Sequence, residues 1–582
     1  MSAPLYGWTG KVLHIDLTTR EAVAQYPPRA LYETWLGGRG LAGYFLRPHC
    51  TLEATDPDLP IAIFAGPLGG TDAPTSCRAF MVSRSPLTGG VLDCAVGGNL
   101  ADHLKRAGWD GLVITGRSTA PCAILIENED VSIEDTDLWG ETCATVFDRM
   151  DDDRSTAAIG PAAENGAPIA SVVVDRHHAA SRGGMGLNWA AKNLKYLSVR
   201  GTGAVPVHDE QALAEAREAI LRLTAASPAL LGQHGFSNHG TAALYDLIDS
   251  RRMMPTDNFR KTRFDGAARL NAVAFERTFA PHAHGCAGCH IRCKRVAADG
   301  RTMPEYEATA HFTALIGNSD PELVMQANDI CGRFGLDPVS AGATLACRRE
   351  ITGEDFSPAS LLKELYEMTE GGFLGNGSLD FAESCEQAEL SMSVKGLELP
   401  AYDPRGAYGL ALAYAVNTRG GCHGHAYPLS HEIFRKPVAT DRFSFSGKAR
   451  IIKLAEDQIA AADSLGVCRF TLLGAGLEEY AKAFAAVTGT PLSAQAMLDT
   501  GERINYRDRI MNAANGFDAC DDDLPPRFFN EEGSSGGGVA IRPLDRQQFL
   551  EARANYYRVR GLDEEGRPTA KTTRRLALEM EP

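Results

Sequence analysis

The sequence of 582 residues is poor in cysteine, in long apolar runs and in net positive charge. Its 14 cysteines are too few for a scaffold held together by disulfides. No stretch approaches the roughly 18 uninterrupted apolar residues of a membrane-spanning helix, so we expect no membrane insertion. The formal charge of −16 disfavours a nucleic-acid backbone or an anionic membrane as the main partner. A small anionic ligand in a local basic pocket is compatible with that charge.

The N-terminal segment MSAPLYGWTGKVLHIDL lacks the basic region followed by an apolar run that marks a signal peptide. Clustered cysteines in a chain without an export signal indicate metal or redox chemistry in a reducing compartment. We therefore predict a cytoplasmic protein.

The chain is longer than the roughly 250–300 residues at which single cores stop growing, so several domains are expected. Residues 1–206 contain short runs typical of strands, such as IAIFAG and IASVVVD, bounded by glycine, proline and aspartate. Apolar residues at helical spacing dominate residues 207–395 and again residues 396–582. The pattern predicts an α+β fold in which a β-rich N-terminal domain precedes two mainly α-helical domains.

Two segments of the β-rich part resemble each other, GWTGKVLHIDLTT from Gly7 and GWDGLVITGRST from Gly108. Such an echo is expected if a β unit has been duplicated. Because the matching stretch is short, coincidence is the alternative interpretation.

A cysteine triplet in HGCAGCHIRCKR is the first candidate site. Cys286, Cys289 and Cys293 follow the spacing C-x2-C-x3-C, and Gly285 and Gly288 allow the loop to wrap closely. Such triplets are typical of the ligands of a 4Fe–4S cluster, with a fourth cysteine that comes from elsewhere in the chain.

Zinc is the competing interpretation of the triplet. Structural zinc sites usually use paired cysteine knuckles, and the sequence has no second knuckle. His284 or His290 could complete a zinc site, but the spacing favours an iron–sulfur cluster. The spacing also runs opposite to the C-x3-C-x2-C order of radical SAM enzymes, which disfavours that class.

Cys468 is the best candidate for the fourth thiolate. It follows Asp463 and the helix-ending Gly466 in DSLGVC, so that a carboxylate, a flexible glycine and a thiolate share one turn. A related turn, GRFGLD, runs from Gly332 to Asp337 after another helix. Either turn alone is most simply an ordinary glycine C-cap. Together with the triplet, the two turns indicate that both face one ligand.

The sequence resembles the tungsten-dependent aldehyde ferredoxin oxidoreductases over essentially its whole length. Besides the triplet, the two turns and the echoed segments, the resemblance rests on LGGRGLAGYFL, AGPLGGTDAP, SRSPLTGG, RGGMGLNWAAKNLK, PEYEAT and KGLELPAYDPRGAYGLALAYAVNTRGGCH. It implies that the β-rich domain is the base for a tungsten ion, with molybdenum less expected, held by the dithiolenes of two pterins. It also implies one 4Fe–4S cluster beside this ion and a Mg²⁺ ion that bridges the pterin phosphates.

The resemblance makes Cys286, Cys289, Cys293 and Cys468 the cluster ligands. It places a second set of residues around the pterins, their phosphates and the magnesium ion: Arg78, Ala95, Gly97, His178, Ala179, Arg182, Leu336, Asp337, Arg419, His425, Asp463, Val467 and Arg469. Within this set, Ala95 and Ala179 would act through their backbone carbonyls around the magnesium ion.

Five positions depart from the family pattern. Gly332 replaces a pterin-binding aspartate, so that one contact is lost or supplied differently. Histidines replace an arginine at His178 and a lysine at His425, and histidine is a weaker and pH-dependent phosphate partner. Ala95 replaces an asparagine, which a main-chain role tolerates, and Val467 replaces a leucine conservatively.

Glu307 in PEYEAT and His423 in RGGCHGH match positions that the family places next to the metal. A buried glutamate can take a proton, and a histidine can polarise a carbonyl oxygen. From the pattern alone, a surface carboxylate and a loop histidine bonded to backbone would be the simpler interpretations. The resemblance makes them the catalytic pair, with Glu305 as a possible substitute for Glu307.

The resemblance implies oxidation of a small aldehyde to a carboxylate, with electrons leaving through the cluster to ferredoxin or a ferredoxin-like subunit. The alternatives are reduction of a carboxylate or of an acyl-CoA or aromatic substrate with the same cofactor, and a metal-free electron-transfer or scaffold protein. Because the chain contains no E-x-x-H motif, we do not expect the iron-bridged homodimer that some family members form.

Overall fold

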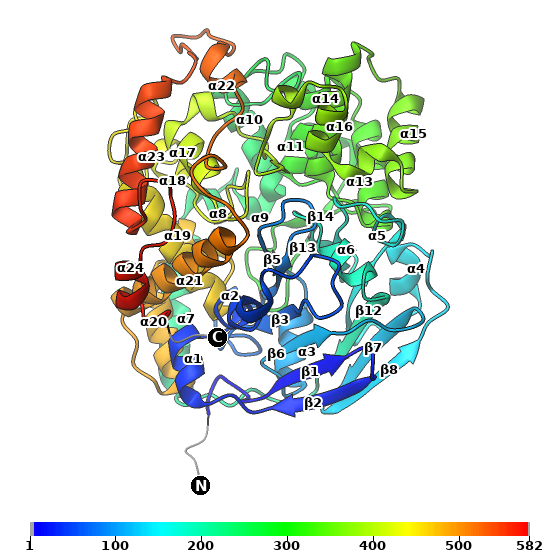
Figure 1. The fold of residues 1–582 in the computed structure, drawn as a ribbon, viewed down its shortest axis with the longest axis vertical. Coiled ribbons are helices and arrows are strands. Elements are labelled where there is room, and N and C mark those ends of the chain that lie inside the picture. Colours follow the sequence, from blue (N-terminus) through cyan, green and yellow to red (C-terminus); the bar gives the residue numbers. More distant parts are fainter. Residues whose placement is uncertain (1–4, 580–582) are drawn as a thin grey trace.

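The computed structural model describes residues 5–579 and places two six-stranded sheets at one end of the molecule, below a large helical part (Figure 1). The strands of these two sheets belong to the first part of the chain, coloured blue to cyan, and most of the helices to the rest. The predicted organisation is confirmed, since a β-rich N-terminal part is followed by mainly helical ones.

The first sheet consists of β1 (Val12–Asp16), β2 (Glu21–Gln25), β3 (Ile61–Ala65), β4 (Ala79–Arg84), β5 (Val91–Val96) and β6 (Gly111–Thr115). The second consists of β7 (Cys122–Glu127), β8 (Asp130–Asp135), β9 (Ser155–Ile159), β10 (Val172–Val174), β11 (His178–Ala180) and β12 (Leu194–Arg200). Their strand orders are β2-β1-β6-β3-β4-β5 and β8-β7-β12-β9-β10-β11. The second sheet thus repeats the topology of the first.

The pairing directions support a duplicated β unit. In each sheet the first strand pairs antiparallel with the second and parallel with the sixth, and the other pairs are antiparallel. The echoed segments do not mark this repeat, because they lie on β1 and β6, parallel neighbours in one sheet with Val12 opposite Gly111. The equivalent of β1 in the second sheet is β7.

Six helices belong to this part: α1 (Arg29–Trp35), α2 (Gly38–Leu46), α3 (Leu100–Arg106), α4 (Cys143–Asp148), α5 (Pro161–Glu164) and α6 (Met185–Ala190). Because α2 covers one side of β3 and β4, every residue of β3 is buried, as its continuous apolar sequence predicts. Helix α3 contacts β3 and also β9 and β12, so it joins the two sheets.

The middle of the chain contains α7 (Glu210–Ala225), α8 (Pro228–Leu231), α9 (Phe236–His239), α10 (Leu244–Ser250), α11 (Ala272–Phe279), α12 (Tyr306–His311), α13 (Pro321–Phe334), α14 (Pro338–Thr352), α15 (Pro358–Thr369) and α16 (Ser378–Ser384). Two hairpins interrupt it, β13 (His282–His284) with β14 (Lys294–Val296), and β15 (Ser393–Val394) with β16 (Leu397–Glu398). The predicted domain boundary at residues 206/207 lies between β12 and α7. The predicted boundary at residues 395/396 lies in the turn between β15 and β16. Both domain boundaries stay predictions.

The last part contains α17 (Tyr408–Val416), α18 (Leu429–Glu432), α19 (Lys448–Leu465), α20 (Leu477–Thr488), α21 (Ala494–Ala514), α22 (Arg527–Asn530), α23 (Arg546–Arg560) and α24 (Ala570–Arg575). Helix α19 packs on α21, α23 and also α2, which fixes this part against the first sheet. Over residues 5–579, no helix is long and apolar enough to cross a membrane.

Helices α13 and α19 both end on a glycine with positive φ, Gly335 at 75° and Gly466 at 80°. Their carbonyls accept backbone hydrogen bonds from equivalent places in the two sheets. Ser171 N donates to Gly335 O over 2.8 Å, and Arg78 N donates to Gly466 O over 3.0 Å. The duplicated sheets therefore hold the two predicted ligand-binding turns in equivalent positions.

Candidate active site

A cavity of about 880 Å³ lies where both sheets, the hairpin β13–β14 and the turn after α13 meet. Most residues that the sequence predicts to bind cofactor or to act in catalysis are on its wall. These are Arg78, Ala95, Gly97, His178, Ala179, Arg182, Cys286, Cys293, Glu307, Leu336, Asp337, Arg419, His423 and Arg469. The fold thus collects residues that are far apart in the sequence.

The other predicted residues, Cys289, His425, Asp463, Val467 and Cys468, are not on this wall. Two of these five residues, Cys468 and Asp463, contact arginines of the cavity wall. Arg78 Nη2 lies 3.3 Å from Cys468 Sγ, and Arg469 Nη2 lies 3.4 Å from Asp463 Oδ2. Cys468 and Asp463 therefore support the wall from the second turn, which follows α19.

The four predicted cluster cysteines form one electrostatic group. Three lie in the loop between β13 and β14, and Cys468 follows α19. Burial and the nearby Cys468 raise the pKa of Cys289 to about 11, and the same two causes raise the pKa of Cys293. Because thiolates so close together repel one another, a bound cation is required to stabilise all four at once.

The arrangement suits a cluster better than a single zinc ion. Within residues 5–579, no three histidine, cysteine or acidic side chains converge closely enough to hold one metal ion. A cube of iron and sulfur places its four thiolates at separate corners, so it does not need that convergence. His290 is also engaged elsewhere, since its Nε2 lies 2.9 Å from Thr224 Oγ1.

Several buried polar atoms on the cavity wall have no hydrogen-bond partner within the protein: Arg182 Nη1, His178 Nε2 and His423 Nδ1. Buried polar atoms are normally satisfied, so these atoms point to a polar ligand. Arg78, Arg182, Arg419 and Arg469 make the wall basic in a chain with a net charge of −16. The residues present therefore fit a large anionic group such as a pair of pterin phosphates.

Ala95 and Ala179, the predicted magnesium carbonyls, occupy equivalent positions of the duplicated sheets. Ala95 on β5 pairs with Phe80 on β4, next to the pair Ala79–Val96. Ala179 on β11 pairs with Val173 on β10, next to the pair Val172–Ala180. Both alanines line the cavity, so the repeat brings equivalent residues of the two edge strands to the same space.

The two turns use their acidic residues differently. Asp337 caps α14, because its Oδ1 accepts from Val339 N at 3.1 Å and its Oδ2 accepts from Ser340 Oγ at 2.9 Å. Asp463 is in the last turn of α19, where burial raises its pKa and its Oδ1 has no hydrogen-bond partner. Asp463 is therefore the carboxylate that is available for a ligand.

Gly332 takes the place in the first turn that Asp463 takes in the second. It lines the cavity, and a Cβ added there would meet nothing within 4 Å. Open space therefore remains at this position.

His425 has a partner other than a phosphate. Its Nε2 lies 2.9 Å from both carboxylate oxygens of Asp93. Burial and the adjacent Arg39 lower the pKa of His425 to about 4, so the ring is neutral near pH 7. Positive charge for a phosphate would therefore come from arginines of the cavity wall, such as Arg182 and Arg419.

Glu307 and His423 lie together, with 3.5 Å between Glu307 Oε1 and His423 Nε2. Glu307 is in the first turn of α12, and its Oε2 accepts from Ala401 N at 2.7 Å. Burial raises the pKa of Glu307 to about 7, whereas burial and Arg182 lower the pKa of His423 to about 3. Near neutral pH, Glu307 can therefore gain and lose a proton beside a neutral imidazole.

Glu305 is not a substitute for Glu307. Its Oε2 lies 3.0 Å from Lys294 Nζ. Burial opposes ionisation, but Lys294 outweighs it and lowers the pKa of Glu305. Glu305 stays ionised at neutral pH, which does not suit a group that exchanges protons.

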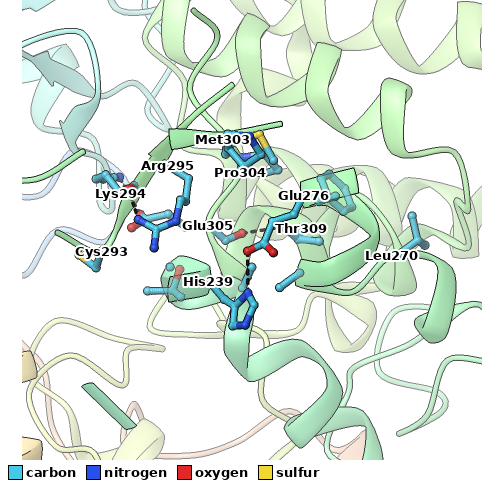
Figure 2. A pocket seen from close by; sticks show the side chains of 16 residues that line it. His239, Leu270, Glu276, Cys293, Lys294, Arg295, Met303, Pro304, Glu305 and Thr309 are labelled. Atoms are coloured by element: carbon cyan, nitrogen blue, oxygen red, sulfur yellow. Dashed lines mark hydrogen bonds and ion pairs between the residues drawn. The ribbon is translucent and has the colours of Figure 1, made fainter. Parts of the chain in front are cut away.

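A small cavity of about 30 Å³ lies on the other side of Cys293, Lys294 and Glu305, next to His239 and Glu276 (Figure 2). Figure 2 shows the His239 ring directed at the Glu276 carboxylate, with 2.6 Å between Nδ1 and Oε1. The space admits no more than a few water molecules, so it is not a substrate site.

Arg39 is a functional residue that the sequence reasoning missed, although LGGRG contains it. It is 1% exposed, and its guanidinium lies 2.6 Å from Asp93, 2.7 Å from Asp508 and 3.9 Å from Asp463. Arg39 thereby holds the second turn against the first sheet. A buried arginine next to a glycine-rich turn was the available signal.

The site thus combines two neighbouring features. One is the set of four cysteines, and the other is a basic cavity between duplicated sheets, with Glu307, whose pKa is raised to about 7, on its wall.

Comparison with known proteins gives the family. Residues 12–201 match the family described as the N-terminal domain of aldehyde ferredoxin oxidoreductase, and residues 215–578 match its domains 2 and 3. The tungsten-containing aldehyde ferredoxin oxidoreductase of Thermococcus kodakarensis is 35% identical, over 99% of both chains. That of Pyrococcus furiosus is also 35% identical, over 97% of this chain and 98% of its own. This chain belongs to the aldehyde ferredoxin oxidoreductase family and is an oxidoreductase.

Relatives with other activities share the fold. A Pyrococcus furiosus aliphatic sulfonate oxidoreductase, WOR-like subunit, is 25% identical over 99% of this chain and 97% of its own. The active-site complex BamBC of benzoyl coenzyme A reductase, solved with 1,5-dienoyl-CoA, superposes with a TM-score of 0.82 at 20% identity, covering 99% of this chain and 98% of that one. The second likeness concerns the fold alone.

Proposed function

We propose that this protein is a cytoplasmic tungsten–pterin enzyme that oxidises aldehydes to carboxylates. The observation that carries the proposal is the pair Glu307 and His423, which lies on the wall of a basic cavity next to the cysteine group. The names of the relatives from Thermococcus and Pyrococcus support tungsten and an aldehyde substrate.

The residues of the wall and of the second turn would take four binding roles. Arg182 and Arg419 would bind the pterin phosphates, and the backbone carbonyls of Ala95 and Ala179 would hold a magnesium ion. Asp463, whose Oδ1 has no hydrogen-bond partner, accepts hydrogen bonds from the polar edge of one pterin. The cysteine group holds a 4Fe–4S cluster.

When bound, the tungsten–pterin group supplies a two-electron oxidant, and the cluster passes the electrons on singly. Oxidation of an aldehyde to a carboxylate takes up oxygen from water and releases electrons and protons. Glu307, with a pKa of about 7, accepts a proton from water or from the hydrated aldehyde. His423 is neutral, so its ring N–H donates to the carbonyl oxygen and orients the substrate.

The electrons then leave to ferredoxin or to a ferredoxin-like subunit. The loop that contains Cys286, Cys289 and Cys293 supports this exit, because all three cysteines are only partly buried and Gly288 is exposed. A cluster near the surface shortens the path to a one-electron acceptor.

Metal analysis and an electron-transfer assay test the proposal. Purified protein should contain near-stoichiometric tungsten with about four irons, and it should reduce a low-potential acceptor only when an aldehyde is added. Metal-replete protein that reduces no acceptor with any aldehyde would refute the aldehyde assignment. Iron without tungsten or molybdenum would instead identify a chain that has lost the pterin centre.

A further inference from the structure

A second large cavity, of about 420 Å³, lies in the helical part of the molecule. It is formed by the end of α18, by the segment between α18 and α19, and by Arg251, which directly follows α10. Figure 1 shows α10 and α18 in the upper half of the molecule, away from both sheets. Of the described residues, none lines both this cavity and that of the candidate active site. The volume is within the range of about 300–1,000 Å³ that is typical of sites for small molecules.

Three arginines line this cavity, Arg251, Arg435 and Arg442. Within residues 5–579, none of the three forms an ion pair, and the side chains of Arg251 and Arg435 form no hydrogen bond either. Burial and the nearby Arg251 lower the pKa of Arg442, because positive charges crowd together here. Guanidinium groups bind phosphates and carboxylates through parallel hydrogen bonds, so these free donors favour an anionic ligand.

Arg442 is held in place by the backbone around it. Its Nη1 donates to Arg251 O over 2.9 Å and to Gly406 O over 3.2 Å. Its guanidinium carbon lies 4.4 Å from the centre of the Phe443 ring, and Tyr408 N donates to Arg442 O over 2.8 Å. Because these hydrogen bonds use Nη1, Nε and Nη2 can still donate to a ligand. The arginine is thus oriented before a ligand binds, which lowers the entropic cost of binding.

The wall also contains a buried acceptor. Glu432, the last residue of α18, is 6% exposed; its Oε1 accepts from Gly409 N over 2.8 Å and lies 2.7 Å from Lys448 Nζ. Its Oε2 has no hydrogen-bond partner among the described residues, which calls for a donor from a ligand. Lys448 balances the charge of Glu432, so this carboxylate does not exclude an anion. The other acidic residue of the wall, Asp441, accepts from Phe443 N over 2.9 Å.

We propose that this cavity binds a small phosphorylated compound that also carries a hydroxyl group. The phosphate, with its three peripheral oxygens, would lie among the three guanidinium groups, and the hydroxyl group would donate to Glu432 Oε2. Ile433 and Phe443 provide apolar walls for the carbon skeleton between them. The inference does not rest on the proposed oxidation of aldehydes, because the two cavities are separate.

Isothermal titration calorimetry of the metal-replete protein tests the inference with two probes, glycerol 3-phosphate and inorganic phosphate. We expect glycerol 3-phosphate to bind more tightly, because it alone has hydroxyl groups on a carbon skeleton. Arg251→Ala and Arg435→Ala should each weaken the binding of both probes roughly 10- to 100-fold. Glu432→Gln should remove the preference for glycerol 3-phosphate. If the amide oxygen of this glutamine accepts from Gly409 N, its NH₂ group takes the place of Oε2 and cannot accept a hydrogen bond.

Arg269→Ala is the matched control, since Arg269 is an exposed arginine that lines neither cavity. Its affinities should equal those of the wild type. The inference would be overturned if the wild type bound neither probe at millimolar concentration, or if binding were unchanged in both Arg251→Ala and Arg435→Ala. Equal affinity of the wild type for the two probes would also overturn it, because the cavity would then attract any anion. If Glu432→Gln does not fold, as judged by circular dichroism, the two arginine variants decide.

Discussion

Glu307 gives the most direct test of the proposed chemistry. Replacing it with glutamine keeps the shape of the side chain and removes the group that exchanges a proton. The hydrogen bond from Ala401 N, 2.7 Å long, can still be accepted by the amide oxygen, so the fold of the site should persist. A change in rate then reports the lost proton acceptor.

The pKa of Glu307 sets the expected pH dependence of the reaction rate. At a pKa of about 7, about half of the side chains are ionised at pH 7 and about a tenth at pH 6. An ordinary glutamate would be almost fully ionised at both values. Because the base must be ionised to accept a proton, kcat/KM should rise with pH and level off above about pH 7. Glu307→Gln should lower kcat roughly 10²–10⁴-fold and abolish this rise.

The assay is the initial rate of acceptor reduction with one aldehyde between pH 5.5 and 8.5, at matched tungsten content. Glu305→Gln is the control, because Glu305 is a nearby carboxylate that Lys294 keeps ionised. The rise near pH 7 should persist in that variant whatever its absolute rate. A wild-type profile without this rise, or a rise that survives in Glu307→Gln, would refute the reasoning.

The remaining predictions concern binding and stability. Cys468→Ser should lower both the iron and the tungsten content of the purified protein, because the turn of Cys468 also contains Asp463. Cys286→Ser should lower mainly the iron content. Elemental analysis of the two variants distinguishes these outcomes. Gly332→Asp should increase the amount of pterin retained per tungsten after dialysis, because its side chain enters open space on the cavity wall; a decrease would contradict this. Arg39→Ala should cost about 3–5 kcal/mol of unfolding free energy in urea, because it leaves buried carboxylates without their cation. A loss below about 1 kcal/mol, the usual scale of a surface ion pair, would contradict it.

Spacing within the sequence was enough to predict the cysteine triplet, the two glycine turns and the change from strands to helices. These are local features, governed by turn geometry and by apolar periodicity. Gly335 and Gly466 do end their helices with positive φ. Family resemblance was needed to select Glu307 and His423, because the partners that define their environment lie far away in the chain.

Other properties depended on tertiary contacts. His425 pairs with Asp93, which lies 332 positions away in the sequence, and no local sequence pattern predicts this contact. The sequence also did not reveal the duplication of the sheet. The two similar segments lie on β1 and β6, which are neighbouring strands of one sheet and not equivalent strands of the two sheets.

The duplicated sheets are equivalent in backbone but not in side chains. Arg78 N in the first sheet and Ser171 N in the second make the same hydrogen bond to a turn glycine. Of these two residues, Arg78 extends a guanidinium to Cys468, whereas the Ser171 hydroxyl is buried without a hydrogen-bond partner. The turn on the first sheet also has the carboxylate of Asp463, where the other has Gly332. The two turns, equivalent in backbone, therefore differ in the charged side chains that surround them.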